Sequence, residues 1–293
     1  MNKGSLYAIS AYVIWGFFPV FFKTMQNVPA LQIMTHRVVW SFVFLISLVV
    51  LRGELRAFVA LLTPRNLVIY LGAGALIAGN WLLYVWGVNS GYILETSLGY
   101  FINPLVSVVL GMVILGERLR TWQWLPVALA GVGVLYLTIS YGKLPWIALA
   151  LACSFGLYGL VKKIAPLGSL YGTTLETGMV WLPALAYLLL QEGNGTGYFA
   201  HSGMATTLLL ATTGVVTAVP LLLFASGARR VPLTTMGLLQ YIAPTLQFLS
   251  GVLIYGEPFN TTRAVGFSII WLALIIFSIE SFVVHRKALS LAA

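Results

Sequence analysis

The fold is decided by residues 94–117, which read LETSLGYFINPLVSVVLGMVILGE. No charged residue stands between Glu95 and Glu117, and a helix of this length, rising about 1.5 Å per residue, crosses the roughly 30 Å hydrocarbon core of a membrane. Asn103 and Pro104 stand near its middle, and a proline inside a helix leaves a carbonyl one turn earlier without its hydrogen bond. Within a membrane such a break is tolerated where neighbouring protein or a water-filled cavity satisfies the freed groups. We therefore expect this helix to line a cavity.

The composition of the whole chain is that of a membrane-spanning protein. Of its 293 residues, 60% are hydrophobic and 8% are charged, with a mean hydropathy of +0.95, whereas soluble domains carry about 25% charged residues. The net charge of +9 is spread over the connections between apolar runs, which favours membrane topology over nucleic-acid binding. The single cysteine, Cys153, excludes an intramolecular disulfide. The first apolar run is followed by no small-residue cleavage site, so we interpret it as a retained helix.

The apolar runs predict an all-α integral membrane protein with ten transmembrane helices. They lie at about 5–23, 33–51, 67–89, 94–115, 122–140, 144–162, 173–190, 205–227, 233–254 and 264–283. Lys and Arg divide 12 to 4 between the two sets of alternate connections. Because positive residues concentrate on the cytoplasmic side of a membrane, this division predicts that both termini are cytoplasmic.

An internal repeat with an offset of 140 residues divides the chain into residues 1–140 and 141–293. The paired positions share residue type, and they are Gly74 with Gly214, Gly111 with Gly251, Pro104 with Pro244, and Gly116-Glu117 with Gly256-Glu257. Each half would hold five spans, and an odd number means that the halves enter the membrane from opposite faces. Inverted repeats of this kind organise secondary transporters, which bind substrate near the bilayer midplane between the halves.

Polar and aromatic side chains mark the expected walls of a central cavity. Tyr100, Asn103 and Ser107 recur at helical spacing and form one stripe, and the repeat places a second polar stripe opposite. The expected substrate-cavity residues are Tyr12, Trp15, Asn80, Trp81, Tyr84, Tyr100, Asn103, Ser107, Tyr158, Gln240, Tyr241 and Gln247. Hydrogen bonding between helices and core packing are the competing interpretation of the same residues. An aromatic-lined pocket would suit an amphipathic organic substrate.

Ionisable residues inside membrane spans are costly, and they indicate function by default. The residues expected to act in gating or coupling are His36, Arg37, Glu95, Glu176, Pro104 and Pro244, the two prolines as flexure points. One hypothesis pairs Glu95 with Arg37 or Lys23 as an outer gate, and another has His36 carry a coupling proton. Snorkelling of these side chains toward the headgroups is the alternative. The pairs Lys162-Lys163 and Arg229-Arg230 we interpret as topology determinants.

Several motifs are absent from the sequence. It has no GxxxxGK[ST] loop, no HExxH and no Cys/His cluster, so we expect no cofactor, no metal and no ATP-driven step. The expected partners are a small-molecule substrate and the lipid bilayer. The alternative function is an integral-membrane enzyme acting on a lipid or polyprenyl substrate, which the dispersed carboxylates disfavour. A membrane scaffold without transport is a third hypothesis.

Six strings in the chain resemble one family. They are AYVIWGFFPVFFK at 11–23, THRVVWS at 35–41, GNWLLYVWGVNSG at 79–91, LETSLGYFINPL at 94–105, LGERL at 115–119 and QYIAPT at 240–245. They resemble the RarD-type branch of the drug/metabolite transporter superfamily, the EamA-like ten-helix permeases. The resemblance implies a bacterial inner-membrane protein of two inverted five-helix repeats around a central cavity, which exports small metabolites or drugs. Members of this branch are commonly labelled chloramphenicol-sensitivity or resistance permeases.

Overall fold

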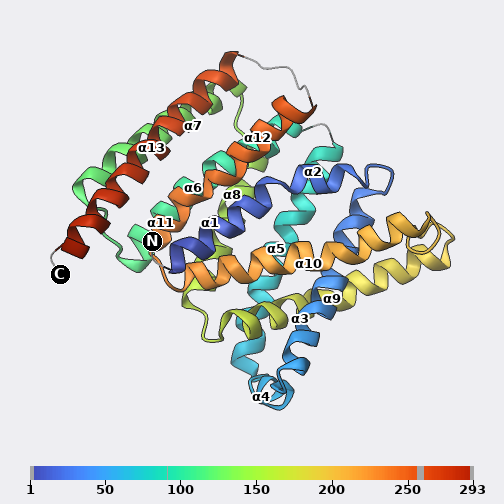
Figure 1. The fold of residues 1–293 in the computed structure, drawn as a ribbon. Helices are drawn as coiled ribbons and strands as arrows, with labels where there is room; N and C mark the ends of the chain where they lie inside the picture. The colour runs from blue at the N-terminus through green and yellow to red at the C-terminus, as the bar shows by residue number, and fades with distance from the viewer. Residues whose placement is uncertain (1–2, 91, 256–260, 291–293) are drawn as a thin grey trace.

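The structure is a computed structural model that describes residues 3–90, 92–255 and 261–290, and Figure 1 shows its helices. The helices are α1 (Lys3–Gly16), α2 (Phe18–Lys23), α3 (Ala30–Leu51), α4 (Leu55–Ala60), α5 (Pro64–Asn89), α6 (Ile93–Leu115), the 3₁₀ turn η1 (Thr121–Gln123), α7 (Trp124–Tyr141), α8 (Trp146–Ile164), α9 (Ser169–Gly193), α10 (Met204–Ala228), α11 (Leu233–Gln240), α12 (Ile242–Tyr255) and α13 (Thr261–Ser290). Nine stretches of the described chain are long and apolar enough to cross a membrane, and a shorter apolar helix covers Ala264–Glu280. The prediction of an all-α membrane protein is confirmed. The Gly256-Glu257 pair of the repeat lies outside the described residues.

The helices at Pro104 and Pro244, the two equivalent prolines of the repeat, differ in continuity. Helix α6 runs without interruption through Pro104, so the break predicted there is wrong. The ninth expected span does divide, at Tyr241, three residues before Pro244. The first expected span also divides, at Phe17, two residues before Pro19. A helix packed on opposite sides tolerates the loss of one hydrogen bond to proline, and α6 has α8 and α11 as close neighbours.

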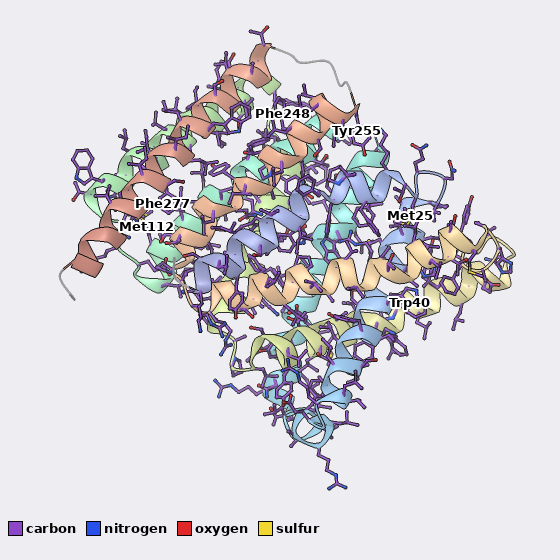
Figure 2. The ribbon with its side chains drawn as sticks, in the orientation of Figure 1. Met25, Trp40, Met112, Phe248, Tyr255 and Phe277 are labelled. Carbon is purple, nitrogen blue, oxygen red and sulfur yellow. The ribbon has the colours of Figure 1, made fainter. Side chains whose placement is uncertain are left out.

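The membrane-spanning helices pack in a small number of close pairs. Helix α1 packs against α10 and α12, α3 against α9 and α10, α5 against α8 and α9, and α6 against α8 and α11. Helices α7 and α13 lie side by side at one edge of the bundle (Figure 1). Met112 and Phe277, labelled in Figure 2, belong to the hydrophobic cluster that joins α6 and α13 to the rest of the bundle.

The two ends of the bundle can be told apart from the chain path. The start of α1, the connection from α10 to α11 and the end of α13 lie at one end, which we call the N-terminal end (Figure 1). Arg230, just after α10, lies over the ring of Tyr7 in α1 at 5.3 Å, which fixes this arrangement. The connection from α2 to α3 lies at the opposite end, which we call the far end.

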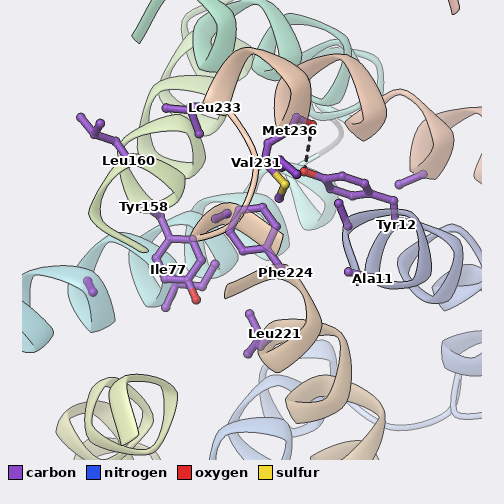
Figure 3. Close-up of a cluster of buried hydrophobic side chains, with 14 residues drawn as sticks. Ala11, Tyr12, Ile77, Tyr158, Leu160, Leu221, Phe224, Val231, Leu233 and Met236 are labelled. Atoms are coloured by element: carbon purple, nitrogen blue, oxygen red, sulfur yellow. Dashed lines mark hydrogen bonds between the residues drawn. The ribbon is translucent and has the colours of Figure 1, made fainter. Parts of the chain in front are cut away.

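Buried aromatic and aliphatic side chains fill the centre of the bundle toward the N-terminal end. Figure 3 shows Tyr12, Tyr158, Phe224, Leu233 and Met236 as members of one buried cluster, and we call these five residues the plug. The rings of Tyr158 and Phe224 stack with centroids 5.9 Å apart. The hydroxyl of Tyr12 donates a hydrogen bond to the carbonyl oxygen of Met236 at 3.1 Å. Each of these five side chains is buried, so the plug occupies the centre of the bundle at this end.

Candidate functional site

A cavity of about 310 Å³ lies in the middle of the bundle and extends toward the far end, a size typical of sites for small organic molecules. Its walls come from the end of α1, α2, the first two turns of α3, the second half of α5, the middle of α6, single residues of α8 and α10, and the region where α11 meets α12. The lining residues are Tyr12, Trp15, Phe18, Pro19, Phe22, Ala30, Ile33, Met34, Arg37, Ile77, Asn80, Trp81, Tyr84, Val85, Tyr100, Asn103, Phe155, Leu221, Gln240, Ala243, Pro244 and Gln247.

The cavity brings together most of the residues predicted to form it. Those that line it are Tyr12, Trp15, Asn80, Trp81, Tyr84, Tyr100, Asn103, Gln240 and Gln247, together with Arg37 and Pro244 from the gating set. Their contact with a substrate stays a prediction. His36, Glu95, Glu176 and Pro104 are not among the lining residues.

Three predicted cavity residues lie elsewhere. Ser107 is buried where α6 meets α11, at a contact so close that a Cβ placed on Gly237 would lie 3.0 Å from the Cβ of Ser107. Tyr241 donates its hydroxyl to the carbonyl oxygen of Phe101 at 3.2 Å. Tyr158 belongs to the plug and donates to a carboxylate described below. Helical spacing predicted that Tyr100, Asn103 and Ser107 all face the cavity, but α11 covers Ser107.

The second expected span contributes a wall that the sequence analysis missed. Ala30, Ile33, Met34 and Arg37 face the cavity from the first two turns of α3. Their spacing of three and four residues is a helical stripe, so the signal was present in the sequence. It was missed because Arg37 was interpreted as a gate at the helix end.

Arg37 lies inside an aromatic box. Its Nε donates a hydrogen bond to Oγ1 of Thr217 at 3.0 Å. Its guanidinium carbon lies 4.7 Å from the ring centroid of Trp81, 4.9 Å from that of Phe22 and 5.5 Å from that of Phe18. These distances are within the range of cation–π attraction.

Glu95 is not paired with Arg37 or Lys23 in this conformation, and the outer gate between them stays a prediction. The carboxylate of Glu95 is buried and accepts hydrogen bonds from the Tyr141 hydroxyl at 2.7 Å and from the Ile147 backbone N–H at 2.8 Å. Lys23 instead places its ammonium over the ring of Tyr255, 3.5 Å from the centroid. Glu95 therefore ties the start of α6 to the connection between α7 and α8.

His36 points away from the cavity. Its ring packs on Phe199 with centroids 5.3 Å apart, and its Nδ1 is buried without a hydrogen-bond partner in the described part of the chain. The role of proton carrier for His36 stays a prediction.

Lys162 is a buried partner of Glu176, a structural role that its interpretation as a topology determinant did not include. Its Nζ lies 2.9 Å from Oε2 of Glu176 and donates to Oγ1 of Thr173 at 3.0 Å. The Tyr158 hydroxyl donates to the other carboxylate oxygen of Glu176 at 2.8 Å. The side chains of Lys162 and Glu176 are 3% and 2% exposed. This network joins α8, α9 and the plug on the N-terminal side of the cavity.

A second set of contacts ties the N-terminal end together around Glu117. Its carboxylate accepts hydrogen bonds from the backbone N–H groups of Leu233 at 2.7 Å and Thr234 at 2.8 Å. A carboxylate at this position suits the positive end of the α11 helix dipole. Lys163 lies 3.6 Å from the same carboxylate and donates to the carbonyl oxygen of Val231 at 2.6 Å. The end of α6 is thereby joined to α8 and to the start of α11.

Arg229 also has an internal structural role beyond membrane topology. It donates to the carbonyl oxygens of Ala165 at 2.6 Å and Leu167 at 2.7 Å. These carbonyls follow the last turn of α8, where no helical N–H is available to them. Arg229 therefore fastens the end of α10 to the end of α8.

The amide side chains of the cavity differ in their hydrogen bonds. Asn80 donates to the carbonyl oxygen of Leu151 at 2.8 Å and to Oγ of Ser154 at 2.9 Å, so it joins α5 to α8. The Oδ1 atom of Asn103 is buried and accepts no hydrogen bond from the residues that the structure describes. Asn80 is thus in part a packing residue, whereas the acceptor of Asn103 has no partner in the described ranges.

Gln247 compensates for the proline that divides the first span. Pro19 has no backbone N–H, so the carbonyl oxygen of Trp15, four residues earlier, has no helical donor. Nε2 of Gln247 donates to this oxygen at 3.1 Å. The contact joins α12 to the break between α1 and α2.

We expect Gln247→Ala to lower the stability of the purified protein by about 0.6–1.7 kcal/mol, the range measured for hydrogen bonds between membrane helices. In a Pro19→Ala background the chain supplies its own N–H to Trp15, and the same substitution is expected to cost much less. Thermal unfolding in detergent of the four combinations measures this difference. If Gln247→Ala lowers stability equally with Pro19 present and in the Pro19→Ala background, Gln247 does not replace the hydrogen bond that Pro19 removes.

Comparison with known proteins places this chain in a class. A family model described as the EamA-like transporter family matches residues 2–139. The chain is therefore a multi-pass membrane transporter and not an enzyme. An uncharacterized transporter of Vibrio cholerae is 47% identical, over 95% of this chain and 93% of the relative. The protein RarD of Escherichia coli is 44% identical over 98% and 97%, and that of Streptomyces exfoliatus is 46% identical over 98% and 91%. The chain belongs to the EamA-like transporter family, and the resemblance found in its sequence strings is confirmed.

The fold has a counterpart among solved structures. One crystal structure superposes with a TM-score of 0.72 at 16% identity, over 95% of this chain and 97% of the other. At this identity the likeness concerns the fold alone.

Proposed function

We propose that this protein is a secondary transporter that moves small organic metabolites or drugs across the bacterial inner membrane by alternating access. The observation that carries the proposal is the central cavity, which extends toward the far end and has the buried plug on its N-terminal side. The division of positive residues supports cytoplasmic termini, so this conformation would face outward.

The proposal includes two inverted five-helix repeats, residues 1–140 and 141–293. Close glycine contacts support it. A Cβ placed on Gly16 would lie 2.6 Å from the Cβ of Leu246, and one placed on Gly156 would lie 2.7 Å from Cγ1 of Val106. Each residue of the first contact is 140 positions from its counterpart in the second. The pairing of α5 with α9 corresponds in the same way to that of α10 with α3.

The hydrogen bond between Tyr241 and Phe101 supports the same proposal. These two residues are 140 positions apart and so occupy equivalent places in the two halves. A direct contact between equivalent residues is expected where a two-fold axis relating the halves passes through the bundle. The match of the family model to residues 2–139 coincides with the first of these halves.

Opening toward the N-terminal end would require the plug and the contacts of Glu117 with α11 to separate. The division of the ninth span at Tyr241, beside Pro244, supplies the flexure point there. The matching role of Pro104 is less well supported because α6 is continuous through it, and the break at Phe17 takes its place in the proposal.

Cysteine labelling tests alternating access without a known substrate. In a Cys153→Ser background, we expect Ile33→Cys in the cavity wall to react with a membrane-impermeant maleimide from the outside of intact cells. Met236→Cys in the plug is expected to react from the cytoplasmic side in inverted vesicles, because the second conformation exposes it there.

The control is Ala130→Cys, a fully buried position of α7 that packs in one cluster with residues of α6, α8 and α13 and is not among the cavity-lining or plug residues. It is expected to stay unlabelled from both sides. If Met236→Cys reacts no faster than Ala130→Cys, the plug does not open and alternating access is refuted.

A further inference from the structure

We propose that the cavity recognises organic anions, and that Arg37 binds the acidic group, preferably a carboxylate, of a substrate with an apolar or aromatic body. The transport of such a molecule rests on the proposed function, whereas its binding can be tested without it.

The first argument is the hydrogen-bond inventory of Arg37. A guanidinium carries five N–H donors in a planar fork and stays charged at any physiological pH. Only Nε has a protein acceptor, Oγ1 of Thr217. The four donors on Nη1 and Nη2 have no acceptor among the described residues. Because Arg37 lines the cavity, a molecule bound there could accept from them. Paired N–H groups of this kind match the two oxygens of a carboxylate.

The second argument is the missing counterion. The ion pairs found in the described ranges join other residues, and none of them includes Arg37. Glu95 and Glu176, two buried carboxylates of the membrane-spanning helices, are held by other partners. The lining residues include no Asp or Glu. A cation inside a membrane protein is costly without a partner, so the cavity favours a ligand that brings a negative charge.

The third argument comes from the rings around Arg37. Trp81, Phe22 and Phe18 stabilise the guanidinium by cation–π attraction but do not neutralise it. A cationic substrate would find these rings already facing a positive charge and would be repelled. An acid with an apolar body would pair with Arg37 and pack on the same aromatic walls. The aromatic residues predicted an amphipathic organic substrate, and the charge of Arg37 adds that this substrate is an anion.

Asn103 adds a further element of recognition. The residue is 3% exposed and lines the cavity, and its Oδ1 is an acceptor without a donor in the described chain. Burying an acceptor without a partner costs free energy. We therefore infer that the preferred ligand also carries an N–H or O–H group.

Binding to the purified protein in detergent tests the proposal with four probes. Phenylacetate carries the acid and the ring, phenylacetamide and phenethylamine keep the ring without the negative charge, and acetate keeps the charge without the ring. By isothermal titration, we expect phenylacetate to bind about tenfold or more tightly than each of the other three. Arg37→Gln is expected to remove this preference and Arg37→Lys to keep part of it. The exposed Arg230→Gln is the matched control and should leave all affinities unchanged.

Four results would overturn the proposal. Three are no binding of phenylacetate, equal affinity for phenylacetamide, and a preference that survives in Arg37→Gln. The fourth is acetate binding as tightly as phenylacetate, because the apolar body would then contribute nothing to binding. If Arg37→Gln does not fold, the comparison of the probes on the native protein still decides. A charge preference without labelling of Met236→Cys would refute the transport proposal alone, and labelling without a charge preference would refute the anion proposal alone.

Discussion

Lys162→Met is expected to lower the free energy of unfolding by about 3–5 kcal/mol, because it leaves the carboxylate of Glu176 buried without its cation. The pair is 2.9 Å apart with both side chains almost fully buried. Tyr158 still donates to Glu176 in the variant, but a neutral donor does not balance a full charge. Thermal unfolding in detergent, followed by size-exclusion chromatography for the fraction that stays monodisperse, measures the loss.

The matched control is Lys143→Met, the same substitution at an exposed lysine, which is expected to change stability by less than about 0.5 kcal/mol. In the double variant Lys162→Met with Glu176→Gln neither charge remains, so we expect stability to recover in part. An unfolding temperature for Lys162→Met equal to that of Lys143→Met would show that the buried pair does not hold α8 to α9.

Gly74→Leu is expected to destabilise the protein by at least the roughly 1–3 kcal/mol typical of an overpacked core. A Cβ on Gly74 would lie 2.8 Å from the backbone carbonyl oxygen of Glu176, and that backbone cannot turn aside as a side chain would. Because this contact sets the distance between α5 and α9, the variant also disturbs the position of the buried ion pair.

Gly72→Leu, two residues earlier in the same helix, is the control. A Cβ at Gly72 would meet no atom within 4 Å, and the position is exposed on the outside of the bundle. We expect this variant to be as stable as the native protein or slightly more stable, since leucine favours a helix over glycine. Equal losses in the two variants, measured by unfolding in detergent, would contradict the assigned close approach of α5 and α9.

Much of the fold could be predicted because the signals are local. The length and apolar character of each run determine where a membrane helix stands, so the predicted spans agree with the helices to within a few residues. Helix α3 begins at Ala30, three residues before the expected 33, because Pro29 directly precedes its first turn. The division of the first span was missed although its cause, Pro19, is visible in the sequence. The proline rule was applied to Pro104, where packing against α8 and α11 keeps the helix continuous.

The cavity could be predicted only in part. Helical spacing put Tyr100 and Asn103 on one face, and both line the cavity. The same spacing included Ser107, which α11 covers. Lys162 and Arg37 were assigned from their places near helix ends, yet each side chain turns inward to partners on other helices.

Hydropathy and motif strings depend on neighbouring residues, and for that reason they were enough to predict a membrane transporter, the positions of its helices and its family. The pairing of Glu176 with Lys162, the bond between Glu95 and Tyr141, and the exposure of Arg37 to the cavity became visible in the packed bundle alone. These outcomes depend on helices distant in sequence, whose packing decides which side of each helix is covered and which charge finds a partner.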